Sequence, residues 1–109
     1  MARGDIFTDK VAVADDAVMT IRPTSGQEAS VHNIGWAFPG TDPTKAEIYR
    51  CDGTSDMLIA DYNTMAALGN SNGMLSVVFH VTYNDYLKVK NVSGTTGYAF
   101  WDGTITKEA

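Results

Sequence analysis

The chain has 109 residues, of which 44% are hydrophobic and 19% are charged, and its 13 acidic and 8 basic residues give a formal net charge of −5. This length suits one domain with its own core, and the composition is that of a folded protein rather than a disordered one. The acidic balance argues against a nucleic acid as the main partner, because binding to phosphates requires a surplus of Lys and Arg.

The polar residues 1–8 are predicted to form an N-terminal arm, and residues 9–109 are predicted to form a single β-domain. Met1–Lys10 lacks the apolar core of a secretory signal, and no stretch approaches the ~18 consecutive apolar residues of a membrane helix. We therefore expect synthesis in the cytoplasm and no membrane-spanning segment.

In the first third of the chain, Phe7–Val13 and Ala17–Arg22 are predicted strands joined by a tight hairpin turn at Asp15-Asp16. A turn over residues 23–27, which contains Pro, Ser and Gly, precedes a long predicted strand over residues 29–38. Period-two alternation gives this strand a largely aromatic face, which we expect to be buried: His32, Ile34, Trp36 and Phe38.

In the middle of the chain, residues 39–45 are predicted to form a surface loop because they include two prolines and a glycine. Residues 46–51 and 57–61 flank Asp52-Gly53, and an Asp-Gly pair between alternating segments is a strong hairpin signal. Residues 62–73 contain several Gly and Asn residues, so they are predicted to form a long loop with at most a short helix at 64–68.

The last third of the chain alternates between strands and turns. Met74–Val81 and Tyr86–Asn91 are predicted strands with apolar residues at period two, and the second has two lysines on its other face. Gly97–Trp101 is a further predicted strand, Asp102-Gly103 a turn, and residues 104–109 an edge strand.

Together these segments make about seven or eight short strands, with no convincing helix and no βαβ rhythm. This pattern predicts an all-β fold, either a small antiparallel β-sandwich or a jelly-roll-like barrel.

Residue types that perform chemistry are few and scattered. His32 and His80 have no metal-ligand spacing, and the single Cys51 excludes an intramolecular disulfide and a cysteine-based zinc site. The aspartates fall in or beside turns, where they bond to their own backbone, and a calcium site between two loops is the remaining alternative. The sequence also lacks a glycine-rich phosphate loop and a nucleophile elbow. We therefore predict a protein that is not an enzyme and has no cofactor and no metal.

Two short motifs lack the secretory context that would give them meaning. Arg3-Gly4-Asp5 matches an integrin-binding tripeptide, and Asn91-Val92-Ser93 matches a glycosylation acceptor. Both matches are interpreted as coincidental.

Several short blocks follow one another along most of the chain: Met1–Ile6, Met19–Pro23, Val31–Ile34, Asp52–Thr54, Phe79–Thr82, Tyr86–Gly94 and Asp102-Gly103. In this order the blocks resemble small virion-associated proteins of tailed bacteriophages. The resemblance implies a structural role in the virion, as a decoration or cement protein that binds the major capsid protein or other virion proteins and stabilises the head. It brings no active-site residues, and such a protein usually binds as a closed homo-oligomer such as a trimer.

The predicted partner-binding residues lie in the arm, near the two segments that depart from the family pattern (36–45 and 63–72), and in a turn. They are Arg3, Asp5, Phe7, Trp36, Phe38, Tyr62, Met65 and Tyr83. The alternative function is a receptor- or carbohydrate-binding module of a fibre or tail, in which a loop aromatic residue such as Tyr83 would stack on a sugar ring.

Overall fold

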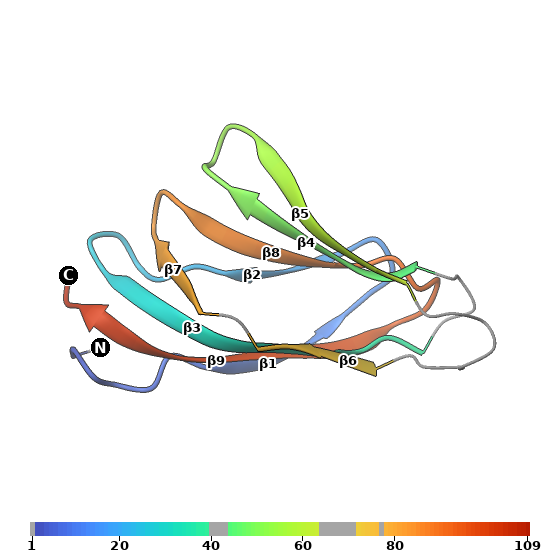
Figure 1. The fold of residues 1–109 in the computed structure, drawn as a ribbon, viewed down its shortest axis with the longest axis horizontal. Helices are drawn as coiled ribbons and strands as arrows, with labels where there is room; N and C mark the ends of the chain where they lie inside the picture. Colours follow the sequence, from blue (N-terminus) through green and yellow to red (C-terminus); the bar gives the residue numbers. More distant parts are fainter. Residues whose placement is uncertain (1, 40–43, 64–71, 77) are drawn as a thin grey trace.

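Two antiparallel sheets pack face to face in the computed structural model, which describes residues 2–39, 44–63, 72–76 and 78–109 (Figure 1). Sheet A has the strand order β1-β9-β3-β6, with β7 also paired to β3, and sheet B has the order β2-β8-β4-β5. The strands in the described residues are β1 (Asp9–Val13), β2 (Val18–Ile21), β3 (Glu28–Ala37), β4 (Thr44–Cys51), β5 (Asp56–Asn63), β6 (Asn72–Leu75), β7 (Phe79–Thr82), β8 (Tyr86–Asn91) and β9 (Gly97–Lys107). The all-β sandwich predicted from the sequence is confirmed.

The core lies between the sheets and is built from the inward faces of their strands. In β8, Leu87 and Val89 are fully buried, while Lys88 and Lys90 on the other face are half-buried, as the alternation predicts. Burial of one such aliphatic side chain stabilises the fold by roughly 1.5–3 kcal/mol. The apolar core therefore stabilises the fold without an intramolecular disulfide, which a single cysteine cannot form.

The hairpin predicted around Asp52-Gly53 is confirmed. β4 and β5 pair antiparallel up to Cys51 and Asp56, and Gly53 has a φ of +88°, which favours glycine. The Oδ1 atom of Asp52 accepts hydrogen bonds from the backbone N–H groups of Thr54 (2.9 Å) and Ser55 (2.7 Å). The aspartate therefore stabilises its own turn.

The hairpin predicted around Asp15-Asp16 is wrong. β1 pairs with β9 in sheet A and β2 pairs with β8 in sheet B, so the chain crosses between the sheets at this turn. Asp16 has a φ of 63°, and its N–H donates to the carbonyl oxygen of Asn91 (2.7 Å). The turn is thus bonded to the end of β8 and does not close a ladder between β1 and β2.

The strand predicted over residues 29–38 is present as β3, and its predicted buried face is confirmed at Ile34, Trp36 and Phe38 but is wrong at His32. The register with β9 shifts between Val31 and Asn33, which is a β-bulge, and His32 at this shift is exposed. The shift by one residue moves the buried face from Val31 to Ile34 and Trp36. The aromatic face is buried only after the bulge.

The single strand predicted over residues 74–81 is wrong. Residues 72–75 form β6 and residues 79–82 form β7, and both pair with β3 along the same edge. Residue 77, which was predicted to lie on the apolar face, is outside the described residues.

The turn predicted at Asp102-Gly103 and the edge strand predicted after it are also wrong. Both belong to β9, which lies between β1 and β3 rather than at an edge. Gly103 allows this close pairing, because a Cβ atom there would lie only 2.2 Å from the carbonyl oxygen of Ser30.

The N-terminal residues 2–8, which were predicted to form an arm, run along β9 of the same chain. The N–H of Gly4 donates to the carbonyl oxygen of Ile105 (2.7 Å), and the N–H of Phe7 donates to that of Gly103 (2.9 Å). Phe7 is 6% exposed. That this segment lies across a neighbouring molecule stays a prediction.

The two predicted loops are only partly described. Residues 44–45 belong to β4, residues 62–63 to β5 and residues 72–73 to β6, while residues 40–43 and the predicted short helix at 64–68 lie outside the described residues. The described part of the chain contains no helix with the length and apolar character needed to cross a membrane.

Candidate interaction surface

The two sheets are tied together along the edge formed by β1 and β2, which we name the closed edge. Asn91 at the end of β8 is fully buried, and its side-chain amide donates to the carbonyl oxygens of Val13 (2.9 Å) and Thr95 (2.7 Å). Its side-chain oxygen accepts from the hydroxyl (2.8 Å) and the N–H (3.0 Å) of Ser93. Because Val13 belongs to sheet A and Asn91 to sheet B, this satisfied polar network connects the sheets.

The same network bears on the Asn91-Val92-Ser93 motif. A glycosylation acceptor must present its side-chain amide at the surface. Here the amide of Asn91 is fully buried and both of its described bonds are to backbone carbonyl oxygens. The folded protein therefore does not present this motif to a modifying enzyme.

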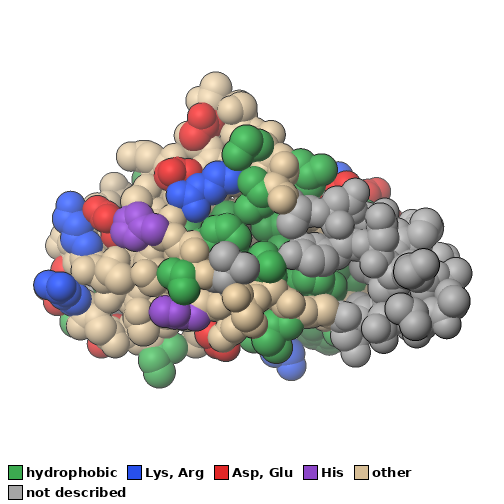
Figure 2. Space-filling view, in the orientation of Figure 1, with side chains coloured by type: hydrophobic (Ala, Val, Ile, Leu, Met, Phe, Trp, Pro, Cys, Tyr) green, Lys and Arg blue, Asp and Glu red, His purple; other side chains and the backbone are tan. Residues whose placement is uncertain are grey.

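The opposite edge of the sandwich is open. β5 is the last strand of sheet B, and β6 and β7 share the last position of sheet A. Large apolar side chains are exposed along this edge: Met57 (62%), Leu58 (46%), Ile59 (37%) and Val78 (65%). We name these four residues the open edge. Figure 2 shows hydrophobic side chains gathered on the face between the β4–β5 hairpin and β6.

The register of β5 explains the exposure of Met57. Met57 lies cross-strand from Arg50, whose side chain points toward sheet A and donates from Nη2 to the carbonyl oxygen of His80 in β7 (2.8 Å). Met57 is therefore on the inward side of sheet B. It stays 62% exposed because, among the strands that the structure describes, β5 packs substantially only against β4, so the described part of sheet A does not cover it.

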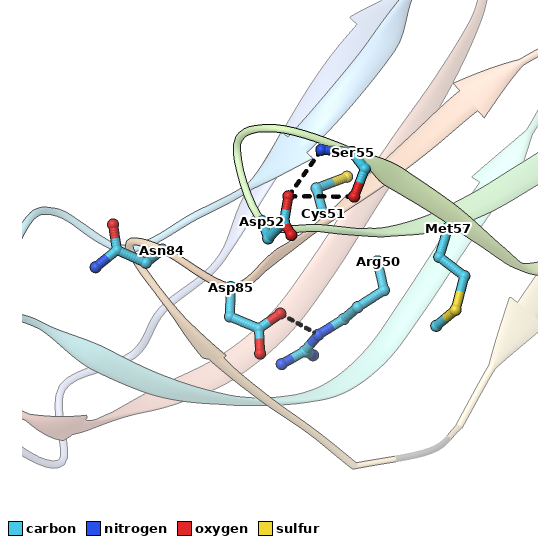
Figure 3. A pocket seen from close by; sticks show the side chains of 7 residues that line it. All are labelled: Arg50, Cys51, Asp52, Ser55, Met57, Asn84 and Asp85. Carbon is cyan, nitrogen blue, oxygen red and sulfur yellow. Dashed lines mark hydrogen bonds and ion pairs between the residues drawn. The ribbon is translucent and has the colours of Figure 1, made fainter.

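A hollow of about 500 Å³ lies at one end of the open edge, between the β4–β5 hairpin and the turn that joins β7 to β8 (Figure 3). It is lined by Arg50, Cys51, Asp52, Ser55, Met57, Asn84 and Asp85. Arg50 and Asp85 form an ion pair in it, with 2.7 Å between Nε and Oδ1. This hydrogen bond lowers the pKa of the Asp85 carboxyl group.

The titratable side chains of the hollow include a buried thiol and a carboxylate bonded to its own turn. Cys51 is 1% exposed, and burial, together with a hydrogen bond to Asp56, raises the pKa of its thiol to about 11. A thiol with this pKa stays protonated at neutral pH and is a poor nucleophile. The pKa of Asp52 is lowered by the N–H groups of Ser55 and Thr54, so this carboxylate stays ionised and bonded to its turn.

Among the residues that the structure describes, no group of three His, Cys, Asp or Glu side chains is placed so that it could hold a metal ion. His80 instead contacts Glu28, with 2.8 Å between Nε2 and Oε1, on the exposed surface of sheet A.

The predicted partner-binding residues that the structure describes do not form one cluster. Arg3 and Asp5 are exposed in the N-terminal turn, whereas Phe7, Trp36 and Phe38 are buried, with exposed fractions of 6%, 6% and 0%. In the single chain these three side chains belong to the core.

Of the remaining three predicted partner-binding residues, one is exposed and the other two have side chains outside the described residues. Tyr83 is 39% exposed, and the guanidinium carbon of Arg22 lies 3.8 Å from its ring centroid. Tyr62 belongs to β5, but its side chain, like the whole of Met65, lies outside the described residues. A partner-binding role for the predicted set stays a prediction.

The sequence-based interpretation missed the open edge. The available signal was the run Met57-Leu58-Ile59, which breaks the period-two alternation just after a hairpin turn. A strand that is apolar on both faces is either covered on both sides or presents one apolar face to a partner.

Comparison with known proteins supports the fold only. The scan against protein-family models finds no match, and no curated protein matches the sequence. Among solved structures, a pentameric capsid protein isolated from metagenomic phage sequences has a TM-score of 0.55 and 15% sequence identity, over 94% of this chain and 62% of that chain.

Two other solved structures share the fold at similar distance. The Drosophila NLP core, described in terms of pentamer formation and histone binding, has a TM-score of 0.51 and 14% identity, over 92% of this chain and 98% of that chain. A Bacillus endospore appendage protein from a family of disulfide-linked pili has a TM-score of 0.50 and 12% identity, over 98% and 93% of the two chains. The three neighbours thus share one sandwich fold and are described as parts of assemblies.

Proposed function

We propose that this protein is a non-enzymatic structural subunit of a tailed-bacteriophage particle, which assembles with copies of itself through the open edge and binds the capsid surface as a decoration or cement protein. The observation that carries the proposal is the exposure of Met57, Leu58, Ile59 and Val78 along the edge formed by β5, β6 and β7. Exposed large apolar side chains gathered at a sheet edge are typical of a protein–protein contact.

The energetics favour a permanent partner at this edge. Exposed edge strands are usually protected by charged residues, Pro or a covering element, because their free backbone groups and apolar side chains invite pairing. Met57, Leu58 and Ile59 in β5 are instead three consecutive apolar residues that stay exposed among the described residues. Since full burial of one aliphatic side chain is worth roughly 1.5–3 kcal/mol, covering several of them supports stable association.

Fold and sequence support the virion context. When β6 and β7 are counted as one interrupted strand, the sheet orders β1-β9-β3-β6 and β2-β8-β4-β5 correspond to an eight-stranded jelly roll, a fold that occurs in viral capsid proteins. The ordered sequence blocks resemble those of phage virion proteins, and one fold neighbour is a phage capsid protein.

The number of copies in the oligomer is part of the proposal. The sequence-based prediction is a trimer, while two fold neighbours are described in terms of pentamers. Either number forms a closed ring, which covers the open edge of every copy.

The receptor- or carbohydrate-binding alternative has less support. Stacking on a sugar requires a free aromatic face. The guanidinium group of Arg22 lies over the Tyr83 ring and also over that of Tyr86, at 3.8 and 4.2 Å from the two centroids.

Native mass spectrometry of the purified chain tests self-assembly. We expect a single oligomer for the wild type and a monomer for the double variant Met57→Asp/Ile59→Asp, because ionised carboxylates at the contact would have to be desolvated. Val18→Asp is the matched control, because Val18 is an exposed apolar residue (43%) on β2 at the closed edge. A monomeric wild type, or a double variant that still assembles, would contradict the proposal.

Quantitative mass spectrometry of purified particles tests the virion role. Hundreds of copies per particle, measured against the major capsid protein, are expected of a shell-binding protein. A dozen or fewer would favour a fibre or tail component, and absence from the particles would refute a virion role.

A further inference from the structure

The outer face of sheet A carries a second apolar surface. Two adjacent cross-strand rows run over β1, β9, β3 and β6, and each combines three apolar or small residues with one polar residue at its end. The apolar and small residues are Ala12, Tyr98 and Ala37 in one row, which ends at Asn72, and Phe100, Gly35 and Met74 in the other, which begins at Lys10. We name these six residues the outer patch. Tyr98 is 56% exposed and Met74 is 61% exposed. The outer face of a sandwich sheet is ordinarily polar, so an apolar patch across four strands indicates a contact.

The outer patch has a shape of its own. At Gly35 a Cβ atom would lie 2.1 Å from the Cε1 atom of Phe100, so the glycine allows the phenyl ring to lie flat across the sheet. Beside the ring lies a shallow hollow of about 310 Å³. Its lining consists of Lys10, Trp36, Ala37, Gly73, Met74, Tyr98, Ala99 and Phe100. The outer patch is therefore a recess, whereas the β4–β5 hairpin is a ridge.

We propose that the outer patch of one molecule receives the β4–β5 hairpin of the next, so that the copies associate head to tail. This inference rests on the proposed self-assembly and names the surface that the open edge contacts. The two surfaces lie on opposite sides of the molecule, since the hairpin rises at the top of Figure 1 and sheet A runs along the bottom. Each copy can therefore use both surfaces at once.

A head-to-tail contact accounts for both surfaces. A two-fold contact is made by one self-complementary patch, so pairing of hairpin with hairpin would leave the outer patch in water. A heterologous contact needs two different patches on the same chain, and this chain provides a ridge and a recess.

Charge favours the same pairing. Lys10 is the cation in the lining of the recess, and its Nζ atom lies 5.4 Å from the centroid of the Tyr98 ring. The hairpin carries the exposed carboxylates of Asp52 and Asp56, of which Asp56 also bonds to Lys88 (3.2 Å). Docking brings this acidic end of the hairpin toward the lysine, which is the complementary arrangement.

Cysteine cross-linking tests the pairing. In a Cys51→Ala background, Leu58→Cys marks the hairpin and Tyr98→Cys marks the outer patch, and a short bismaleimide reagent joins cysteines that lie close together. We expect covalent dimers from a mixture of the two single variants, none from either variant alone, and higher covalent oligomers from the chain that carries both. Thr20→Cys on β2 replaces Tyr98→Cys in the control mixture, which is expected to give no dimer.

A second variant tests the contact in case the cysteine substitutions themselves weaken assembly. Tyr98→Ser removes an exposed ring from the outer patch, and we expect it to weaken assembly about tenfold or more, while Val18→Ser has no such effect.

The outcomes separate the two proposals. Dimers from a single cysteine variant, or an unchanged oligomer for Tyr98→Ser, would overturn the head-to-tail contact while the wild-type oligomer still upheld self-assembly. A wild type that is monomeric in native mass spectrometry would refute both.

Discussion

The closed edge and the open edge belong to the same sandwich, but different contacts join the two sheets at each of them. At the closed edge, the buried Asn91 side chain bonds to Val13, Ser93 and Thr95, and the backbone of Asp16 and Ala17 bonds to the backbone of Asn91. At the open edge, the described contact between the sheets is the Arg50 side chain, which reaches Asp85 and the carbonyl oxygen of His80.

The difference shows how one small fold can separate stability from association. A satisfied buried polar network fixes how the two sheets meet, and its loss is costly because each partner left behind is desolvated. Exposed Met, Leu and Ile side chains contribute little to the stability of the single chain, but they gain free energy when a second molecule covers them. We therefore expect variants at the two edges to have opposite effects on stability and on assembly.

Among the variants at the two edges, the largest expected effect on stability is at the closed edge. Asn91→Leu keeps the approximate volume but leaves the carbonyl oxygens of Val13 and Thr95 and the hydroxyl of Ser93 without this partner. We expect the free energy of unfolding to fall by about 3 kcal/mol, as measured by urea denaturation. The exposed Asn84→Ala is the control, with an expected change within about 0.5 kcal/mol. Equal effects of the two variants would show that the network does not hold the edge.

The second expected effect is on the alkylation rate of the Cys51 thiol, which lines the hollow at the open edge. Because its pKa is raised from 9.0 to about 11, the thiolate fraction at pH 8 is about a hundredfold lower than for an ordinary cysteine. Alkylation by iodoacetamide should be slower than in urea by at least this factor. The folded state favours the thiol, so this contribution to stability is complete below pH 9 and is lost as the pH rises toward 11. Equal alkylation rates in buffer and urea would contradict the buried assignment.

The third expected effect is at the rim of the open edge. Arg50→Met removes the ion pair with Asp85, whose side chains are 25% and 52% exposed, and should cost at most about 1 kcal/mol. Because Arg50 lowers the pKa of Asp85, the stabilisation is present above the ordinary carboxyl pKa and is lost as the pH falls through the lowered value. Urea denaturation at neutral and acidic pH should show a difference between wild type and variant that shrinks in acid. A constant difference would exclude the ion pair as its cause.

The smallest expected effect on the stability of the single chain is on the hairpin ridge. Leu58→Ser should change the unfolding free energy of the monomer by no more than about 0.5 kcal/mol, because the side chain is 46% exposed. Ile48→Ala on the neighbouring β4 is the matched comparison, since Ile48 is fully buried and its loss should cost about 2–5 kcal/mol. Denaturation at concentrations below assembly measures both. A large loss for Leu58→Ser would place the ridge in the core of the single chain.

The sequence predicts well those parts of the fold that depend on residues close to one another along the chain. β8 follows from the alternation of Leu87 and Val89 with two lysines, and the β4–β5 hairpin follows from Asp52-Gly53. Both signals lie within a few residues of the element they predict.

The failures have long-range causes. The turn at Asp15-Asp16 has hairpin chemistry, but β1 and β2 find partners about 70 or more residues away in different sheets. The bulge at His32 changes which face is buried without a local signal. Gly103 has turn chemistry, yet it serves close approach to β3.

The candidate surface was harder to predict than the fold. Whether Met57 is core or surface depends on whether a strand of sheet A lies opposite β5, and no local pattern contains that information. The outer patch likewise requires the register of four strands, because its rows combine residues as distant as Ala12 and Tyr98.

The central position of β9 also has a consequence for biosynthesis. β9 lies between β1 and β3 and pairs with both, so sheet A cannot close until β9 has left the ribosome. Until then both strands have unpaired edges, at a stage when long-range pairing is slow and sticky intermediates form. Folding intermediates in which β9 has not yet docked therefore expose one unpaired edge of β1 and one of β3, and such edges favour aggregation.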